Sequence, residues 1–310
     1  MLSHRLDRWL RRTEPYKSLN LTQAHIEKLL RQKKILVNGQ KASANTRITD
    51  IDQVSLSKDI SLSSLKIAER QVPSFSAAAY TQKDIDFLIS LIIWEDEEIC
   101  VLNKPTGLAV QGGTGTRRHL DGLLQAYGQG KPFRLVHRLD KDTSGVIVVA
   151  KTLEKSIQLA QAFQEGRVEK IYWALVEGLP SPAYGTIKAP LSKDLQGSYE
   201  KVIVDTKTGK SALTDYRLIK SLRQQAAWIE LSPKTGRTHQ LRAHCSYIGH
   251  PIIGDFKYGA RKTKDELCLH ARHIRIPDIH SGRGMIFTAP PPVHIQDILQ
   301  SFGVDWERYC

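Results

Sequence analysis

Apolar and charged positions recur with helical spacing in the first residues of the chain. Leu2, Leu6 and Leu10 lie four residues apart with Trp9 beside them, which predicts an amphipathic helix whose charged residues face solvent. The tetrapeptide HRLD at positions 4 to 7 falls in this helix. We therefore expect Asp7 to be a surface charge.

A second amphipathic helix and a small sheet follow. The segment NLTQAHIEKLLRQKK places its apolar residues on one face, with Asn20 or Thr22 as N-cap. ILVNGQKA predicts a β-hairpin that turns at Asn38 and Gly39, and ITDIDQVSL predicts another short strand. Residues 1–56 thus read as a compact α+β module.

The rest of the chain has a different pattern. Residues 57–85 are rich in Ser and Ala without a sustained period, which predicts a linker. Residues 86–310 contain short runs of β-branched and aromatic residues bounded by Gly, Pro or Asp: EICVLNKP, GVIVVAK, KIYWALVEG, KVIVD, SALTDYRLIK and QAAWIELS. The clearest helix is TLEKSIQLAQAFQEG, from its N-cap Thr152 to Gly166. We predict an α+β domain with a mixed, largely antiparallel central sheet.

Charge adds a class of partner to this picture. The 310 residues carry a formal net charge of +13, and residues 1–56 hold 11 Lys and Arg against 5 Asp and Glu. Such a balance favours a polyanion, because neutralising phosphates releases condensed counterions, and nucleic acid is the leading candidate. The alternative is an enzyme that is merely basic.

Several classes of protein are disfavoured. No apolar run approaches the roughly 20 residues of a membrane span, and the first residues lack the apolar core of a signal peptide. Cys100, Cys245, Cys268 and Cys310 are widely spaced, so neither a structural zinc site nor a disulfide framework is predicted. We expect a cytoplasmic protein, with an organelle as the alternative because the first 34 residues are rich in Arg, although Asp7 and Glu14 interrupt the acid-poor pattern of a transit peptide. We expect a monomer because no exposed heptad pattern or long apolar stripe is present.

The tetrapeptide HRLD occurs again at positions 137 to 140. There it leads through the turn formers DTSG into VIVVA, a run that is apolar on both faces and therefore predicts a buried strand. A tight loop against a rigid strand is a suitable place for a catalytic carboxylate such as Asp140. The alternative, in which Asp140 and Asp142 only cap the turn, is equally consistent with this local sequence.

Three further segments carry polar groups that chemistry can use. KPTGLAVQGGTG is a Gly-rich loop after a strand, KIYWALVEG is a strand with Tyr172 on one face, and PKTGRTHQLRAH is strongly basic. Each alone has a plain explanation, as a loop, a core tyrosine or a solvated basic surface.

Together these segments resemble the motif set of the RluA family of pseudouridine synthases. LVHRLDKDTSGVIVVAKT is similar to the family's catalytic motif, and HPIIGDFKYG, LCLHARHIRI and FTAPPP follow in the family's order, from about residue 94 to 292. LNKPTGLAVQGG is most similar to the RluC members, and an N-terminal S4-like domain would imply the branch of the family that modifies large-subunit ribosomal RNA. Gln111 departs from the family pattern, where His is expected.

The resemblance implies catalytic roles for three residues. Asp140 would be the catalytic carboxylate, either as a nucleophile at the sugar or as the base that removes a ribose proton. Arg242 would pair with Asp140 and favour its ionised form. Tyr172 would stack on the flipped base and accept the proton from C5 of the uracil.

It also implies how substrate is held. Arg138 would take the place of the flipped base, Leu241 would line the uracil pocket, and Lys104 and Arg237 would be structural or RNA-backbone contacts. The implied partner is large-subunit ribosomal RNA or a pre-ribosomal particle, with no cofactor and no metal. A non-catalytic RNA-binding protein that keeps the fold, such as a ribosome-assembly factor, is the alternative.

Residues 1–56 resemble the S4 RNA-binding domain, through RLDRWL and LLRQKKILVNG in the same order. The resemblance implies RNA contacts by the basic residues of the two helices, which are Arg8, Arg11, Arg12, Lys28, Arg31, Lys33 and Lys34. A basic helical cap that binds nothing is the alternative.

Other motifs fail on spacing. TGKS at positions 208 to 211 has Val204 where a phosphate loop needs Gly, and GGTG lacks the third Gly of a dinucleotide fingerprint. His239 and His244 do not form the HExxH pattern of a metal hydrolase, so we expect them to be hydrogen-bonded within their own motif.

Overall fold

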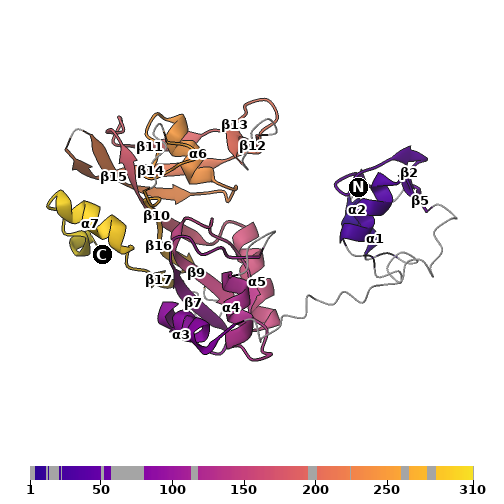
Figure 1. Ribbon diagram of the computed structural model, residues 1–310. Coiled ribbons are helices and arrows are strands. Elements are labelled where there is room, and N and C mark those ends of the chain that lie inside the picture. Colours follow the sequence, from indigo (N-terminus) through magenta and orange to yellow (C-terminus); the bar gives the residue numbers. More distant parts are fainter. Residues whose placement is uncertain are drawn as a thin grey trace. The chain divides into compact units, whose positions relative to one another are not determined.

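The computed structural model describes residues 4–11, 13, 21, 23–49, 52–56, 80–112, 118–194, 201–223, 225–259, 265–277 and 284–309. The chain divides into two compact units, 1–75 and 76–310 (Figure 1). This boundary lies within the expected linker, most of which falls outside the described residues, as does Arg12. Each unit has a hydrophobic core of its own.

The N-terminal unit contains two helices and short antiparallel strands. In chain order these are β1 His4–Arg5, α1 Leu6–Leu10, α2 Gln23–Arg31, β2 Ile35–Val37, β3 Gln40–Lys41, β4 Arg47–Ile48 and β5 Val54–Leu56. The predicted hairpin is confirmed, because β2 pairs with β3 across Asn38 and Gly39, which both have positive φ. Two positive φ angles at the turn match the twist of the strands that it joins.

The first HRLD is not a continuous helix, and Asp7 is not a surface charge. His4 and Arg5 form a strand, the helix begins at Leu6, and Asp7 is only 4% exposed. Its carboxylate accepts 3.1 Å and 2.7 Å hydrogen bonds from the Arg5 guanidinium and a 2.8 Å bond from the backbone N–H of Arg8. The prediction was wrong because helical spacing does not reveal that an acidic residue in the first turn is held by a preceding arginine and by a free N–H group.

The C-terminal unit is built on a ten-stranded sheet. Its main path runs β11-β14-β15-β10-β16-β9-β7-β6, with β17 added to β16 and β8 added to β9. The strands are β6 Ile92–Glu95, β7 Ile99–Lys104, β8 Arg134–Leu135, β9 Ser144–Ala150, β10 Glu169–Glu177, β11 Tyr184–Lys188, β14 Leu213–Leu222, β15 Ala226–Pro233, β16 Leu269–Ile276 and β17 Met285–Thr288. Within this sheet only β9 and β16 pair in parallel among the described residues, which confirms a mixed, largely antiparallel sheet.

Helices and a small hairpin surround this sheet. The helices are α3 Gln82–Leu91, α4 Leu120–Tyr127, α5 Leu153–Gln164, α6 Gln240–Tyr247, α7 Val293–Ser301 and the 3₁₀ helix η3 Trp306–Tyr309, and the hairpin joins β12 Leu191–Lys193 to β13 Val202–Val204. The α5 prediction is confirmed, since the Thr152 side chain caps the backbone N–H of Lys155. The N-terminus of α6 was hard to foresee, because His239 precedes it in the left-handed conformation, without a side-chain cap.

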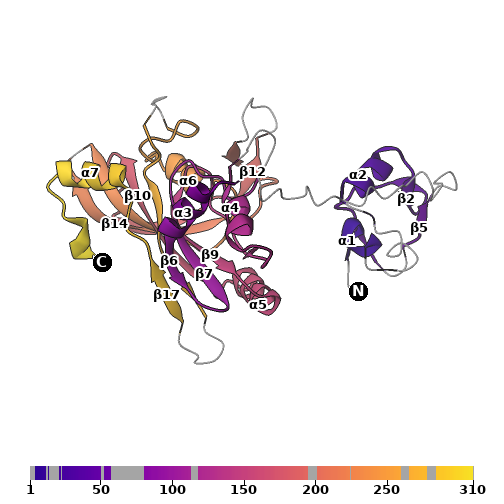
Figure 2. The same cartoon turned by 60° about the horizontal axis from the view of Figure 1, so that its bottom comes forward.

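The sheet joins two lobes. Figure 1 shows β10 and β16 in the middle, with β7, β9, α3, α4 and α5 on one side and β11, β14, β15 and α6 on the other. Figure 2, turned by 60° from the first view, shows α7 beside β14 at the outer edge of this unit. Separate hydrophobic clusters fill the two lobes, and the Tyr172 side chain packs against one cluster from each. Tyr172 therefore lies where the lobes meet.

Strand β9 is buried along its whole length, as the VIVVA run predicted. Ile147 and Val149 belong to one cluster, and Val146, Val148 and Ala150 belong to another on the opposite face of the strand. Alternate residues of a strand point to opposite faces, so a strand covered on both sides is apolar throughout.

The entry to β9 depends on a glycine. Gly145 has a φ of +113° and pairs with Ala271 in the parallel ladder between β9 and β16. A Cβ atom at this position would lie 2.2 Å from the carbonyl oxygen of Ala271, a backbone atom of a central strand. Only glycine fits both the backbone angle and the space.

We predict that Gly145→Ala destabilises the protein by about 3 kcal/mol or more, through backbone strain and the clash with β16. Thermal or urea unfolding measures the change. Gly166→Ala is the matched control: Gly166 also has positive φ (+72°) but nothing lies within 4 Å of an added Cβ, so about 1 kcal/mol is expected. Equal effects of the two substitutions would contradict the role of the close contact.

Candidate active site

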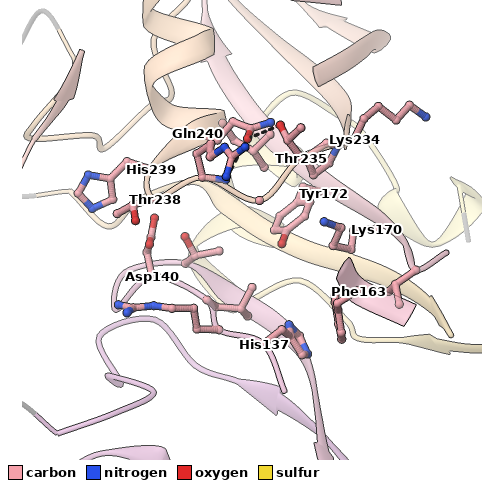
Figure 3. A pocket seen from close by; sticks show the side chains of 18 of the residues that line it. His137, Asp140, Phe163, Lys170, Tyr172, Lys234, Thr235, Thr238, His239 and Gln240 are labelled. Carbon is pink, nitrogen blue, oxygen red and sulfur yellow. Dashed lines mark hydrogen bonds between the residues drawn. The ribbon is translucent and has the colours of Figure 1, made fainter. Parts of the chain in front are cut away.

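A cavity of about 560 Å³ lies between the two lobes of the C-terminal unit (Figure 3). Its lining comes from the segment before β9, the end of α5, strand β10, the loop between β15 and α6, and the start of β16. Six of the seven site residues predicted for this unit line the cavity: Arg138, Asp140, Tyr172, Arg237, Leu241 and Arg242. The fold thus gathers residues that are up to a hundred positions apart in the chain.

The loop that carries Asp140 is fixed on its N-terminal side by His137. Strand β8 pairs with the end of β9 and then leaves it, and there the His137 Nε2 atom accepts a 2.9 Å hydrogen bond from the backbone N–H of Val148. The imidazole stacks on the Phe163 ring, and burial lowers the pKa of His137 to about 3, with a smaller contribution from Lys170. His137 is therefore neutral and takes the place of the next strand residue.

On its other side the loop is fixed by Lys104, which is fully buried. The Nζ atom donates hydrogen bonds of 2.8–2.9 Å to the carbonyl oxygens of Pro105, Leu108 and Lys141. The carbonyl oxygen of Asp140 also accepts a 3.1 Å bond from the N–H of Thr143. Asp140 is thus held between two fixed points on the rigid strands β7 and β9.

Lys104 does not line the cavity, so its position supports the structural alternative for its role rather than contact with substrate. Burial lowers the pKa of Lys104 to about 7, while the charges of Asp142 and Asp140 raise it. The three carbonyl acceptors use all three ammonium hydrogens, which is the arrangement that a charged lysine requires.

Tyr172 is placed by an irregularity in β10. The register between β10 and β16 shifts between Ile171 and Tyr172, and the ring lies in the cavity against both lobes. Burial raises the pKa of Tyr172, and the negative charge of Asp140 raises it further. The hydroxyl group of Tyr172 is therefore protonated at neutral pH.

Arg242 forms its ion pair with Asp255, and among the described residues no hydrogen bond or ion pair joins it to Asp140, so the expected pairing with Asp140 stays a prediction. Its Nε and Nη2 atoms each donate a 2.7 Å hydrogen bond to one carboxylate oxygen of Asp255, and both side chains are almost completely buried. Asp255 also accepts the backbone N–H groups of Lys257 and Tyr258. A planar guanidinium fork that already holds one carboxylate in bidentate geometry is not available to pair with a second in the same way.

The positive charge of Arg242 nevertheless interacts electrostatically with Asp140. Burial lowers the pKa of Arg242, but the hydrogen bonds and charge of Asp255, together with a contribution from Asp140, outweigh it and raise the pKa. Arg242 is therefore a permanent buried charge at the wall of the cavity.

Gln240 fixes the basic loop between β15 and α6. Its Oε1 atom accepts hydrogen bonds from the Thr235 hydroxyl and the N–H of Arg237, and its Nε2 atom donates to the Leu213 carbonyl and the Thr214 hydroxyl. Figure 3 marks the bond to Thr235. All the hydrogen-bonding capacity of this buried amide is used, so the loop has one defined conformation.

Both histidines of this segment are hydrogen-bonded, but their partners lie outside the segment 233–244, so the expectation that they bond within their own motif is wrong. His244 contacts the Thr214 hydroxyl and the Ala189 carbonyl, at 2.9 and 3.0 Å, and His239 contacts the Tyr258 hydroxyl at 3.0 Å. Burial lowers the pKa of both. Within the described ranges, no group of three or more His, Cys, Asp or Glu is arranged to hold a metal ion.

The remaining predicted residues differ in exposure. Arg138 is exposed at the cavity, Leu241 is 7% exposed beneath it, and the exposed Arg237 donates to the Ser211 carbonyl. In the N-terminal unit, five of the predicted RNA contacts are exposed, namely Arg8, Arg11, Lys28, Arg31 and Lys33, and Lys34 is partly buried. No helix in the described part of the chain is long and apolar enough to cross a bilayer.

Sequence reasoning did not single out several residues that shape the site. Asp255 and Tyr258 lie in HPIIGDFKYG, which was part of the motif set, so an acidic residue near the basic motif was a usable signal. His137 and Gln240 lie in the same motifs as the predicted site residues Asp140 and Arg242. For Lys170 the signal was its position two residues before Tyr172 on the same strand.

The comparisons with known proteins agree on one family. The sequence profile of the RNA pseudouridylate synthase family matches residues 98–247. The ribosomal large subunit pseudouridine synthase C of Rickettsia bellii is 40% identical over 302 residues, which cover 96% of this chain and 97% of the relative. The proteins of the same name from Rickettsia typhi and Vibrio vulnificus are 37% and 32% identical and cover 94% and 97% of this chain, and 94% and 93% of their own lengths.

Solved structures give the same result. Human RNA Pseudouridylate Synthase Domain Containing 4 superposes with a TM-score of 0.62 at 25% identity, covering 72% of this chain and 98% of that chain. Human RNA Pseudouridylate Synthase Domain Containing 1 gives a TM-score of 0.56 at 26% identity, over 69% of this chain and 94% of that chain.

We predict that Asp255→Asn lowers the free energy of unfolding by about 3–5 kcal/mol, because it leaves the buried Arg242 without its counterion. Asp140→Asn is the matched control, since Asp140 has no ion pair within the described residues, and it should change stability by less than about 1 kcal/mol. Urea unfolding monitored by tryptophan fluorescence measures both. A larger loss of stability for Asp140→Asn than for Asp255→Asn would restore the pairing that the sequence suggested.

Proposed function

The chain belongs to the family of RNA pseudouridylate synthases, and we propose that it isomerises uridine to pseudouridine in large-subunit ribosomal RNA with Asp140 as its catalytic carboxylate. One observation carries the assignment of Asp140: it is the only acidic residue among the described residues that line the cavity. The names of the relatives support ribosomal RNA as the substrate.

The reaction sets the demands on these residues. The C1′–N1 bond of uridine breaks, the uracil turns, and C5 bonds to the same ribose carbon, after which the C5 proton leaves and N1 gains a proton. To reach the cavity, the base must first leave its stack, at a cost of roughly a few kcal/mol. A fixed carboxylate at the sugar either adds to C1′ or removes a ribose proton to give a glycal, and the position of Asp140 is compatible with both.

Tyr172 and Arg138 handle the flipped base. The Tyr172 ring provides a stacking surface, worth roughly 1–3 kcal/mol in proteins that bind single strands. Because the hydroxyl of Tyr172 is protonated in the free enzyme, Tyr172 contributes to binding through its aromatic ring and not as a tyrosinate. The exposed Arg138 beside Asp140 stands where a guanidinium can replace the base in its stack, and Leu241 forms an apolar wall for the uracil.

Arg242 acts through position and charge. Its pairing with Asp255 anchors the loop 255–259 to α6, and its buried charge lies close enough to Asp140 to interact with it. Arg237, at the exposed edge of the basic loop, is suited to contact an RNA phosphate.

Residues 1–56 act as an S4-like domain that binds the RNA outside the cavity. The support is the exposed Lys and Arg on and directly after α1 and α2, together with the short antiparallel strands of this unit. We further propose that residues 57–85 link this domain to the catalytic domain of residues 86–310, that the protein acts in the cytoplasm as a monomer, and that its substrate is large-subunit RNA, free or in a pre-ribosomal particle.

Asp140→Asn should abolish activity, by at least about 1,000-fold, because the amide can neither add to the sugar nor accept a proton. Release of tritium from RNA labelled at C5 of uridine measures the reaction. Asp142→Asn, the same change in the same loop but outside the cavity lining, should keep at least about a third of the activity. If Asp140→Asn were as active as Asp142→Asn, Asp140 would be only a turn residue. If the wild-type protein itself were inactive, a non-catalytic RNA-binding protein would be favoured.

Neutralising the exposed cluster should weaken RNA binding and flatten its salt dependence. For the triple variant Lys28→Gln, Arg31→Gln, Lys33→Gln, the slope of log K against log salt should fall by about 0.7–0.9 for each phosphate that the protein no longer neutralises. Filter binding to large-subunit rRNA between low and physiological salt measures the slope, and a circular dichroism spectrum controls for folding. Deletion of residues 1–56 should have a larger effect in the same direction. Unchanged binding at every salt concentration would reduce the N-terminal unit to a passive cap.

A further inference from the structure

The cation Lys170, on strand β10, faces the cavity. Lys170 lies two residues before Tyr172, and both side chains line the same space. In the view of Figure 3, the Tyr172 ring lies between Asp140 and the amino group of Lys170. The roles proposed above for Asp140, Tyr172 and Arg242 make no use of this lysine.

Lys170 has no counterion in the described part of the chain. Its amino group forms no hydrogen bond or ion pair there, although the side chain is partly buried and burial lowers its pKa. Two other basic residues of the lining have carboxylate partners, since Arg242 pairs with Asp255 and Lys234 with Asp215. A cation that is removed from water without a partner is costly, unless an anion arrives with the substrate.

The described residues around Lys170 offer no carboxylate that could serve instead. The neighbouring lining residues Phe163 and Val168 are apolar, and the neutral His137 uses its Nε2 atom for the Val148 N–H. Asp140, the one acidic lining residue, contributes to the electrostatics of Tyr172 and Arg242, whereas burial is the only cause that acts on Lys170. Lys170 therefore faces the cavity without a carboxylate partner among the described residues.

We propose that Lys170 is a further catalytic residue, whose ammonium group stabilises the uracil while it is detached from the ribose. This inference rests on the proposed function. When the C1′–N1 bond breaks, both bonding electrons leave with the base, and its negative charge spreads to O2 and O4. The charge disappears when C5 bonds to C1′. The C5 proton then passes to solvent water and N1 takes up a proton from solvent, so that the product is neutral and no net proton is gained or lost.

A lysine is suited to this task. Its ammonium group is a compact charge with three donors on a flexible stem, so it can stay with a carbonyl oxygen while the ring turns from N1 to C5. Uridine in the ground state is neutral and gains little from such a contact. The stabilisation therefore belongs to the transition state and the intermediate, and it should raise the rate of the chemical step rather than the affinity for RNA.

The test separates these two quantities. Lys170→Met keeps the length of the side chain without its charge, and Lys170→Arg keeps a charge. The rate constant of a single turnover with excess enzyme and the Kd for the same rRNA fragment are measured for each. We expect Lys170→Met to lower the rate about 100-fold with less than a twofold change in Kd, and Lys170→Arg to recover at least a tenth of the wild-type rate.

Lys220→Met is the matched control, because it removes one exposed positive charge from the same unit, on β14 and away from the cavity. It should leave the rate unchanged. Thermal unfolding accompanies every variant, and Lys170→Gln replaces Lys170→Met in the comparison if the methionine variant does not fold.

Two results would overturn the proposal. A wild-type rate in the uncharged variant would remove any role in the reaction, and a raised Kd with an unchanged rate would make Lys170 a contact to an RNA phosphate. A wild-type protein without any pseudouridine formation would instead contradict the proposed function, which keeps the two failures distinguishable.

Discussion

The attachment of one short loop to the buried strand β9 is the constraint on which the site depends. His137 replaces a strand residue at Val148, and Lys104 ties the carbonyl of Lys141 to the loop after β7. Both contacts use uncommon groups, a partly buried neutral histidine and a fully buried lysine whose three ammonium hydrogens all have carbonyl acceptors. The backbone of Asp140 is therefore fixed, while its carboxylate faces the cavity.

The charges of the cavity follow from this arrangement. A single carboxylate faces a wall that contains Arg242, already neutralised by Asp255, and Lys170, which has no such partner in the described ranges. Arg242, paired with Asp255, is part of the wall of the cavity, whereas Lys170 provides a positive charge that is available to the substrate. A cation without a counterion suits a reaction in which the base becomes negative and then neutral again, because it can stabilise the base while the base carries charge.

Much of the fold could be predicted from sequence, because its signals are local. The all-apolar run of β9, the turn at Asn38 and Gly39 and the cap of α5 at Thr152 each depend on neighbouring residues. The Arg242–Asp255 pair could not be predicted in this way, since it depends on which of two acidic residues packs against α6. Asp7 misled the prediction because helical spacing cannot distinguish a solvated carboxylate from one that a nearby arginine holds in the core.

The most direct measurement of the central claim is a map of pseudouridine across large-subunit rRNA, by mass spectrometry, in cells with and without the gene. We predict that one or more sites lose their pseudouridine when the gene is deleted and regain it when the wild-type gene is returned. An identical map in both strains would contradict the claim that this chain modifies large-subunit rRNA.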